Sequence, residues 1–280
     1  MKISRVSAAA AAAVVALGLT ACGDGGGDSA STGDGGGGAY KVGIKFDQPG
    51  LGLKEGSEYT GLDVDVATFI AKELGHEAKD IQWVQAPSAQ RETLIKTGQV
   101  DMIVATYSIT DKRKAEVSFA GPYFIAGQDL LVRADETAIT GPETLTGKKL
   151  CSVTGSTSAQ KVKDKYPGVQ LQEFGTYSEC VTALVSKGVD ALTTDNTILA
   201  GYAAQDQYKG KLKVVGKTFS EERYGVGIKK GDTATCEKIN TAIQKMVDSG
   251  EWQKAVDANL GPAGFKVDTA VNPPKADACA

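Results

Sequence analysis

The sequence has few of the residues that bind metal ions in proteins. It contains one histidine, His76, and none of its five cysteines lies in a CxxC pair. Zinc sites and similar clusters need several histidine or cysteine ligands at short spacing, so we expect no bound metal. The chain also lacks a basic cluster, and its 31 lysines and arginines are outnumbered by 34 aspartates and glutamates. Nucleic acid is therefore not an expected partner.

Catalytic patterns are missing as well. The sequence offers no nucleophile and base pair, and His76 follows Gly75 at the expected end of a helix, where a surface position is predicted. The glycine-rich run of residues 23–38 lacks the lysine and the preceding strand of a phosphate-binding loop. We therefore expect neither a cofactor nor catalytic residues, and a binding protein is favoured over an enzyme.

Apolar segments long enough to span a membrane are also absent. The apolar run at residues 6–19 follows Lys2 and Arg5, and it is shorter than the roughly 20 residues of a spanning helix. A positive start followed by a short apolar run is typical of a secretory signal peptide. We expect residues 1–21 to be that signal peptide.

The end of this segment, Leu19-Thr20-Ala21-Cys22, resembles the bacterial lipobox. The resemblance implies cleavage before Cys22, acylation of its thiol, for example with palmitate, and a lipid anchor on the outer face of the cell membrane. Residues 22–39 are mostly Gly, Ser and Asp and are expected to form a flexible linker. An ordinary signal peptide followed by a stray cysteine is the alternative.

Four cysteines remain after Cys22, and in an exported protein they can form two disulfides. Three pairings are possible. We favour Cys151 with Cys180, which joins an expected strand start to a nearby helix. The other bridge, Cys236 with Cys279, would then hold the C-terminal tail against the body of the protein.

The rest of the chain alternates short apolar runs with helical patterns, which is typical of α/β layers with parallel strands. Strands are expected at residues 40–45 and 101–106, and a helix at residues 63–74, where apolar side chains recur on one face. A second set of units starts near residue 149, and the strand expected at residues 225–229 returns to the first set. Because no long linker separates the two sets, we expect two short hinge crossings. Ligands of such sheets bind beyond the carboxyl ends of the strands.

Six short stretches carry a family resemblance. They are GLDVDVA at residues 61–67, LIKTGQVDMIVA at 94–105, SITDKRK at 108–114, FAGPY at 119–123, TGSTS at 154–158 and GVDALTTDN at 188–196. Together they resemble the polar amino acid binding proteins of ABC importers, bacterial extracellular solute-binding protein family 3. The resemblance covers nearly the whole mature chain in the family's order.

This resemblance implies an α/β, two-lobed periplasmic-binding-protein-like fold (type II), with two βαβ lobes joined by a two-crossing hinge. We place lobe 1 at residues 40–133 and 219–280, and lobe 2 at residues 134–218. The resemblance also implies that a monomer captures an amino acid between the lobes and delivers it to an ABC permease, whose ATPase is a separate protein. Contact with the membrane is expected through the lipid anchor only.

The family pattern assigns the α-carboxylate of the ligand to Arg113, through a two-pronged guanidinium contact. Backbone N–H groups near Ser108, and near Thr157 and Ser158 at an expected helix start, would bind the same carboxylate. Contact from both lobes would draw them together. The plainer interpretation is that Arg113 is a solvated charge among neighbouring lysines and that the serines only cap a helix.

Asp195 matches the family's aspartate for the ammonium group of the ligand, with the carbonyl of Thr106 assisting. It lies at the end of an expected strand, where parallel sheets bind their ligands. An aspartate at this position can also be a helix cap, because Asn196 opens the next expected helix.

The side-chain pocket is expected to favour an acidic amino acid. Arg91 resembles the arginine with which acidic amino acid binders of the family hold the distal carboxylate, and Ser88 is nearby. Lys45 could add positive charge, and Phe46 could stack on the aliphatic part of the ligand. A second arginine favours glutamate, with aspartate and glutamine left open, and it disfavours cationic ligands. The alternative places Arg91 on the helix surface.

Two other functions fit the same fold. Cyclohexadienyl or arogenate dehydratases resemble it, which keeps an enzyme under consideration. A ligand-sensing ectodomain that acts through another protein is the second alternative.

Overall fold

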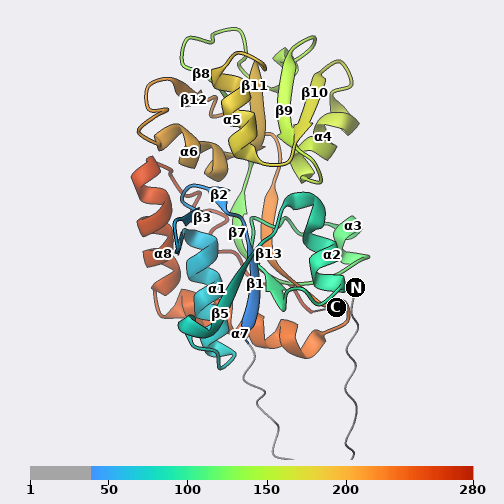
Figure 1. Cartoon of the computed structure of the whole chain (residues 1–280), viewed down its shortest axis with the longest axis vertical. Helices are drawn as coiled ribbons and strands as arrows, with labels where there is room; N and C mark the ends of the chain where they lie inside the picture. Colours follow the sequence, from blue (N-terminus) through green and yellow to red (C-terminus); the bar gives the residue numbers. More distant parts are fainter. Residues whose placement is uncertain (1–38, 280) are drawn as a thin grey trace, which may run out of the picture. The chain divides into compact units, whose positions relative to one another are not determined.

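The computed structural model describes residues 39–279. The expected signal peptide, Cys22 and the expected linker up to residue 38 lie outside the described residues. Within residues 39–279, no helix is both long and apolar enough to cross a membrane. This part of the chain contains two five-stranded sheets and one three-stranded sheet, with helices packed around them (Figure 1).

Lobe 1 is built around one of the five-stranded sheets. Its elements are β1 (Tyr40–Ile44), β2 (Asp47–Gln48), β3 (Gly52–Glu55), β4 (Glu58–Thr60), α1 (Leu62–Glu73), η1 (Ala78–Asp80), β5 (Ile81–Gln85), η2 (Ser88–Gln90), α2 (Arg91–Lys96), β6 (Met102–Ile103), α3 (Asp111–Lys114), β7 (Ser118–Ala126), β13 (Glu222–Ile228), α7 (Thr233–Asp248), α8 (Glu251–Leu260) and η4 (Gly261–Ala263). The strand order is β5-β1-β6-β13-β7, and β2, β3 and β4 form the small sheet. β1 is parallel to β5 and β6, whereas β13 is antiparallel to β6 and β7.

Lobe 2 contains the other five-stranded sheet, in the order β10-β9-β11-β8-β12. Its elements are β8 (Gln128–Arg133), η3 (Pro142–Thr144), β9 (Lys149–Val153), α4 (Thr157–Lys165), β10 (Gln170–Phe174), α5 (Tyr177–Val185), β11 (Ala191–Asp195), α6 (Asn196–Ala204) and β12 (Leu212–Val214). The chain passes between the two sheets twice, once between β7 and β8 and once between β12 and β13.

The boundary expected after residue 133 assigns β8 to lobe 1, whereas β8 hydrogen-bonds to β11 and β12 in the second sheet. Only Gly127 separates β7 from β8, so the chain runs almost directly from one sheet into the other. No change of composition marks such a crossing. From here on, lobe 2 means residues 127–221 and lobe 1 the remaining described residues.

The helical spacing of its apolar residues explains why α1 forms. Leu62, Val66 and Ile70 are fully buried, and burial of each such side chain contributes roughly 1.5–3 kcal/mol. The helix was expected at residues 63–74 and spans Leu62–Glu73. It starts after Gly61, whose φ of 119° lies in a region that favours glycine. A Cβ on Gly61 would also lie 2.1 Å from the carbonyl oxygen of Leu51.

The strand expected at residues 101–106 is much shorter than predicted, because β6 is only Met102–Ile103. Val104 still donates its N–H to the carbonyl oxygen of Gly43. Thr106 then adopts a φ of 45°, in the left-handed region, which turns the chain out of the sheet. The carboxyl end of this strand therefore continues as a turn that carries candidate site residues.

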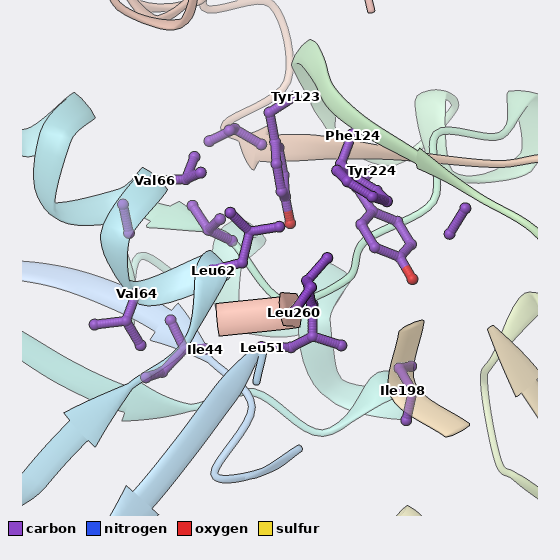
Figure 2. Packing of buried hydrophobic residues seen from close by; sticks show 14 of the residues in the cluster. Ile44, Leu51, Leu62, Val64, Val66, Tyr123, Phe124, Ile198, Tyr224 and Leu260 are labelled. Atoms are coloured by element: carbon purple, nitrogen blue, oxygen red, sulfur yellow. The ribbon is translucent and has the colours of Figure 1, made fainter. Parts of the chain in front are cut away.

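The buried cluster of lobe 1 joins the two strands that lead to lobe 2. Figure 2 shows Tyr123 and Phe124 of β7 beside Tyr224 of β13, and both tyrosines and Phe124 are at most 1% exposed. The ring centroids of Phe124 and Tyr224 are 6.0 Å apart. Trp252 of α8 donates its indole N–H to the carbonyl oxygen of Tyr123. The crossing strands are therefore fixed by aromatic packing at the lobe 1 end.

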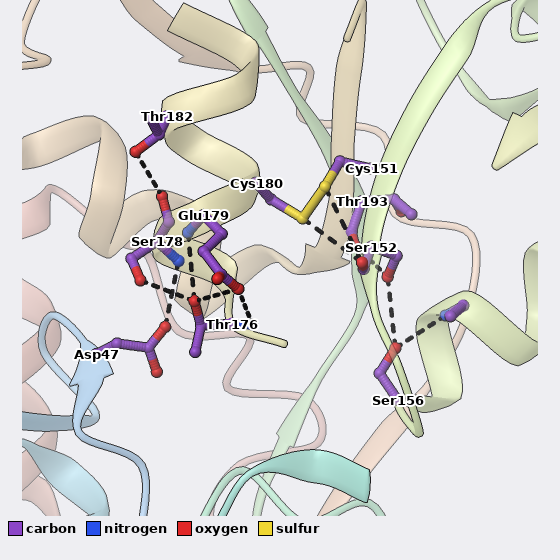
Figure 3. Close-up of a disulfide and its surroundings, with 11 residues drawn as sticks. Asp47, Cys151, Ser152, Ser156, Thr176, Ser178, Glu179, Cys180, Thr182 and Thr193 are labelled. Carbon is purple, nitrogen blue, oxygen red and sulfur yellow. Dashed lines mark hydrogen bonds between the residues drawn. A yellow bond between two sulfur atoms is a disulfide. The ribbon is translucent and has the colours of Figure 1, made fainter. Parts of the chain in front are cut away.

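Two disulfides are present among residues 39–279, with the pairing favoured from the sequence. Cys151 of β9 is bonded to Cys180 of α5 (Figure 3), and Cys236 of α7 is bonded to Cys279. The first bridge lies in lobe 2 and the second in lobe 1. Each joins a helix to a segment outside it.

The C-terminal tail runs beside β7, the outermost strand of the lobe 1 sheet. The side-chain amide of Asn272 donates to the carbonyl oxygen of Ile125 and accepts from the Ile125 N–H, both at 2.9 Å. Further along, Asp277 donates its N–H to the carbonyl oxygen of Gly121 at 2.7 Å. The Asp277 carboxylate also pairs with Arg223 of β13 at 2.7 Å. The tail therefore contacts both strands that lead to lobe 2.

Candidate ligand-binding site

The turn after β6 is held in place by a buried carboxylate. Asp63 of α1 accepts the Thr106 N–H at 2.9 Å and the Tyr123 hydroxyl at 2.6 Å. Thr106 in turn donates its hydroxyl to Gln48 Oε1 at 3.1 Å. Burial raises the pKa of Asp63 to about 6. These contacts fix the backbone from which the next candidate residues project.

Arg113 is buried, although Lys112 and Lys114 on either side of it are exposed. Its Nη1 donates to the carbonyl oxygen of Ser108 at 2.8 Å, and its Nη2 donates to the carbonyl oxygen of Gly155 in lobe 2 at 3.0 Å. The interpretation as one solvated charge in a basic cluster therefore does not describe Arg113. The guanidinium lies where both lobes meet.

Ser108 and Thr157 come from different lobes, and both contact Glu222, the first residue of β13. Glu222 Oε2 accepts from Ser108 Oγ at 2.7 Å and from Thr157 Oγ1 at 2.9 Å. Lys161 of α4 forms an ion pair with the same carboxylate. Glu222 is 1% exposed, so the pair lies in a setting where charges attract strongly. Ser156 caps α4 by accepting the Ala159 N–H at 3.0 Å.

Asp195 lies at the start of α6 but does not cap it, because its side chain makes no capping hydrogen bond. The Tyr224 hydroxyl donates to Asp195 Oδ2 at 2.7 Å. The other oxygen, Oδ1, is buried without a hydrogen-bond partner among residues 39–279. Burial, with the negative charge of Glu222 adding to it, raises the pKa of Asp195 to about 7. The carboxyl group thus has one oxygen available for a cationic group.

Arg91 is 2% exposed, so the interpretation as a surface arginine does not hold. Its Nη1 donates to the carbonyl oxygen of Ala105 at 3.0 Å, and its guanidinium lies 4.2 Å from the ring centroid of Tyr107. Its Nε is buried and has no hydrogen-bond partner within the described chain. Burial and the neighbouring Arg113 lower the pKa of Arg91 to about 10.

Lys45 adds a third buried basic side chain to this region. Its Nζ donates to Ser88 Oγ at 2.8 Å, and the residue is 5% exposed. Burial and the charge of Arg91 lower the pKa of Lys45 well below its usual range. Phe46, the next residue, is half-buried and packs on Tyr59 with ring centroids 5.3 Å apart. The region therefore places basic side chains beside an aromatic ring.

Most of the predicted site residues line two small cavities of about 10 Å³ each. The first is lined by Ser88, Arg91, Thr106, Ser156, Thr157, Ser158, Tyr177, Thr194, Asp195 and Ile198. Lys45 and Phe46 line the second, and Tyr177 lines both. Each volume is close to that of one water molecule, so the two lobes lie close together here. Arg113 instead lines a larger cavity of about 430 Å³ between α2, α3 and α4. Ser108 lines neither small cavity, but its hydroxyl contacts that of Thr157.

Two residues of this region were missed by the sequence analysis. Glu222 is the first residue of β13, and nothing in the sequence distinguishes it from its neighbour Glu221. Tyr177 begins α5 and is 4% exposed. Both lie outside the recognised motifs, and the fold brings them to the site. Within residues 39–279, no group of three or more His, Cys, Asp or Glu residues is arranged to hold a metal ion.

Comparison with known proteins gives a consistent result. Residues 40–270 match the family model of the bacterial extracellular solute-binding proteins, family 3. The chain is 50% identical over 254 residues to the glutamate-binding protein GluB of Corynebacterium glutamicum, covering 87% of this chain and 85% of that protein. It is 39% identical over 214 residues to the ABC transporter glutamine-binding protein GlnH of Bacillus subtilis, covering 76% and 77%.

Solved structures agree with the two-lobed fold expected from the sequence. An ancestral arginine-binding protein bound to glutamine has a TM-score of 0.74 and 35% identity, covering 79% of this chain and 97% of that one. The ancestral amino acid-binding protein AncCDT-1, a precursor of cyclohexadienyl dehydratase, has a TM-score of 0.71 and 29% identity, covering 79% and 94%. The resemblance drawn from the six sequence motifs is thus confirmed. The chain belongs to family 3 of the bacterial extracellular solute-binding proteins.

Proposed function

We propose that this protein captures an amino acid, with glutamate preferred, between its two lobes and delivers it to an ABC permease. The observation that carries the proposal is a pair of buried polar atoms that have no hydrogen-bond partner among residues 39–279, Asp195 Oδ1 and Arg91 Nε, on two residues that line the same small cavity. Buried polar atoms without partners are costly. A ligand that brings an ammonium group and a carboxylate would satisfy both.

The α-amino acid end of the ligand finds matching groups on both lobes. Asp195 and the carbonyl of Thr106 are suited to the ammonium group, and Arg113 is suited to the α-carboxylate. Backbone N–H groups near Ser108, and at the start of α4 near Thr157 and Ser158, would add donors to that carboxylate. Because these groups belong to different lobes, ligand binding would favour the closed arrangement.

The side-chain end of the ligand is proposed to be acidic. Arg91 and Lys45 are buried close to each other, and Ser88, which accepts from Lys45, lines the cavity. A buried guanidinium with a basic amine beside it favours a distal carboxylate over an amide and disfavours a cationic side chain. Relatives named as glutamate-binding support this preference. Another relative is named as glutamine-binding, so glutamine is included among the ligands to be tested.

An enzymatic function has weaker support. A structural relative is a precursor of cyclohexadienyl dehydratase, but the sequence relatives named above are solute-binding proteins. His76, at the far end of α1, is stacked on Tyr40 with ring centroids 4.1 Å apart and lines neither small cavity. We therefore infer that the chain binds its ligand without transforming it.

The family acts outside the cytoplasm, as its description states. Within that setting we infer a lipid anchor on Cys22 at the outer face of the membrane. The protein would act as a monomer beside a permease that is energised by a separate ATPase. Mass spectrometry of the membrane fraction tests the anchor, because acylation shifts the mass of the N-terminal peptide. A free thiol on Cys22 would contradict this part of the proposal.

Isothermal titration of the purified protein against the twenty amino acids tests the ligand. We expect glutamate to bind most tightly, aspartate or glutamine more weakly, and arginine and lysine not measurably. A flat response to all twenty would reject amino acid capture. Turnover of arogenate or prephenate by the same sample would support the enzymatic alternative instead.

A further inference from the structure

A second set of contacts joins the lobes outside the proposed ligand contacts, at the short strand β2. Asp47 of β2 belongs to lobe 1, and its Oδ2 accepts the N–H of Ser178 in the first turn of α5 at 3.2 Å (Figure 3). The Tyr202 hydroxyl of α6 lies 3.1 Å from the same oxygen and also within hydrogen-bonding distance of the Asp47 carbonyl oxygen. Two helices of lobe 2 therefore converge on one residue of lobe 1.

The same region contains a very close backbone contact. A Cβ on Gly201 of α6 would lie 2.1 Å from the carbonyl oxygen of Pro49, the residue after β2. The turn around Pro49 is fixed, because Leu51 donates its N–H to the Gln48 carbonyl and Leu62 donates its N–H to the Gly50 carbonyl. Helix α6 thus packs directly on lobe 1 backbone, and only glycine fits at this point.

We propose that Asp47, Tyr202 and Gly201 form a closure latch, which holds the lobes together independently of a bound amino acid. The inference rests on the proposed function, since it assigns these residues to the closure of an amino acid binding protein. Asp47 lines the second small cavity, but its carboxylate is engaged by lobe 2. The partial positive charge at the start of α5 strengthens that contact.

The latch predicts that affinity and selectivity are controlled by different residues. A ligand that binds only the closed form has an apparent affinity proportional to the closed population. Loss of a latch contact lowers that population equally for every ligand. The affinities for glutamate and glutamine should therefore fall by the same factor, and their ratio should stay unchanged. Arg91 is predicted to change that ratio instead.

Tyr202→Phe removes the hydroxyl and keeps the packing of the ring. One hydrogen bond of this kind corresponds to roughly a threefold to tenfold loss of affinity. Small-angle scattering of the protein without ligand should show a larger radius of gyration than the parent. Tyr208→Phe is the control, because Tyr208 is a half-buried tyrosine of the same lobe that follows α6, and it should change neither quantity.

Gly201→Ala gives a sharper test, because its effects on stability and affinity have opposite signs. Alanine favours a helix over glycine by about 1 kcal/mol, so the open protein should melt at a higher temperature. The added methyl group collides with Pro49 on closure, so affinity should fall at least tenfold by the population argument. Gly261→Ala is the matched control, since Gly261 has helical backbone angles and no atom of the described chain lies within 4 Å of an added Cβ.

The radius of gyration without ligand and the ratio of glutamate to glutamine affinity separate this inference from the proposed function. An unchanged radius of gyration in both Tyr202→Phe and Gly201→Ala, measured without ligand, would overturn the latch whatever the ligand is. A changed ratio of glutamate to glutamine affinity would overturn it too, because it would place these residues in ligand recognition. A failure of the parent protein to bind any amino acid would reject the proposed function, while the scattering result still decides the latch.

Discussion

The guanidinium of Arg113 in lobe 1 donates through Nη2 to the backbone carbonyl of Gly155 in lobe 2, at 3.0 Å. A second nitrogen, Nη1, donates to the carbonyl oxygen of Ser108. One side chain thus connects the turn after β6 with the segment that leads into α4. The hydrogen bond between Arg113 and Gly155 requires the two lobes to be close together.

Arg113→Ala is expected to abolish measurable amino acid binding. Removal of one partner from a buried charge pair costs roughly 3–5 kcal/mol, which corresponds to a loss of affinity of more than about a hundredfold. Titration calorimetry with glutamate measures the effect. Lys112→Ala is the control, because Lys112 is an exposed neighbour and should keep the parent affinity. Retained binding in Arg113→Ala would remove Arg113 from the proposed carboxylate site.

Arg91→Ala is expected to weaken glutamate more than glutamine. The distal carboxylate loses a charged partner, whereas the distal amide loses only a hydrogen bond. Parallel titrations with both ligands give the ratio of the two affinities. Lys96→Ala, at the exposed end of the same helix, should leave that ratio at its parent value. Equal weakening of both ligands by Arg91→Ala would contradict the acidic preference.

The pH dependence of binding should follow Asp195. Its pKa is raised from 3.8 to about 7, and an ammonium group binds the ionised carboxylate, so affinity should rise between about pH 6 and pH 8. The carboxyl group should release a proton on binding. Calorimetry in buffers of different ionisation enthalpy would detect that release. Asp195→Asn should bind weakly and lose this pH dependence, and a parent affinity that falls over the same range would contradict the assignment.

The stability of the unliganded protein should have the opposite pH dependence. The folded-state pKa of Asp195, about 7, lies above its unfolded value of 3.8. Between these two pH values the folded state therefore holds more protons than the unfolded state. The stabilising contribution is complete below about pH 4 and is lost as the pH rises through about 7. Denaturant unfolding of the parent and of Asp195→Asn measures it. The variant should show the shallower slope of unfolding free energy against pH.

The bridge between Cys236 and Cys279 is expected to stabilise lobe 1. It joins residues 43 positions apart, and disulfides of this kind typically contribute about 2–4 kcal/mol. The double variant Cys236→Ser and Cys279→Ser should therefore lose that amount of unfolding free energy in urea. The corresponding double variant of Cys151 and Cys180 compares the bridge of lobe 2. An unchanged midpoint in both would show that the bridges do not contribute to stability.

Local sequence patterns predicted elements and candidate residues that a short stretch of chain marks. Helix α1 was expected within one residue at each end, because Leu62, Val66 and Ile70 follow the helical period and are all fully buried. Arg113 was singled out as a candidate ligand-binding residue from the contiguous motif around it. In both cases the determining information lies within a short stretch of chain.

Contacts between distant segments could not be predicted in this way. Glu222 accepts from Ser108 and Thr157, which are 114 and 65 residues away in the chain. The early end of β6 is also non-local in origin, since Thr106 turns out of the sheet where Asp63 accepts its N–H. Neither partner is marked by a pattern near the residue itself.

The C-terminal tail has a consequence beyond the strands it contacts. An outermost strand carries free N–H and carbonyl groups, which can pair with a strand of another molecule and begin aggregation. On β7 the side chain of Asn272 occupies both backbone groups of Ile125, and Asp277 occupies the carbonyl of Gly121. The tail thus serves as a cover that keeps β7 from acting as a template for intermolecular β-pairing.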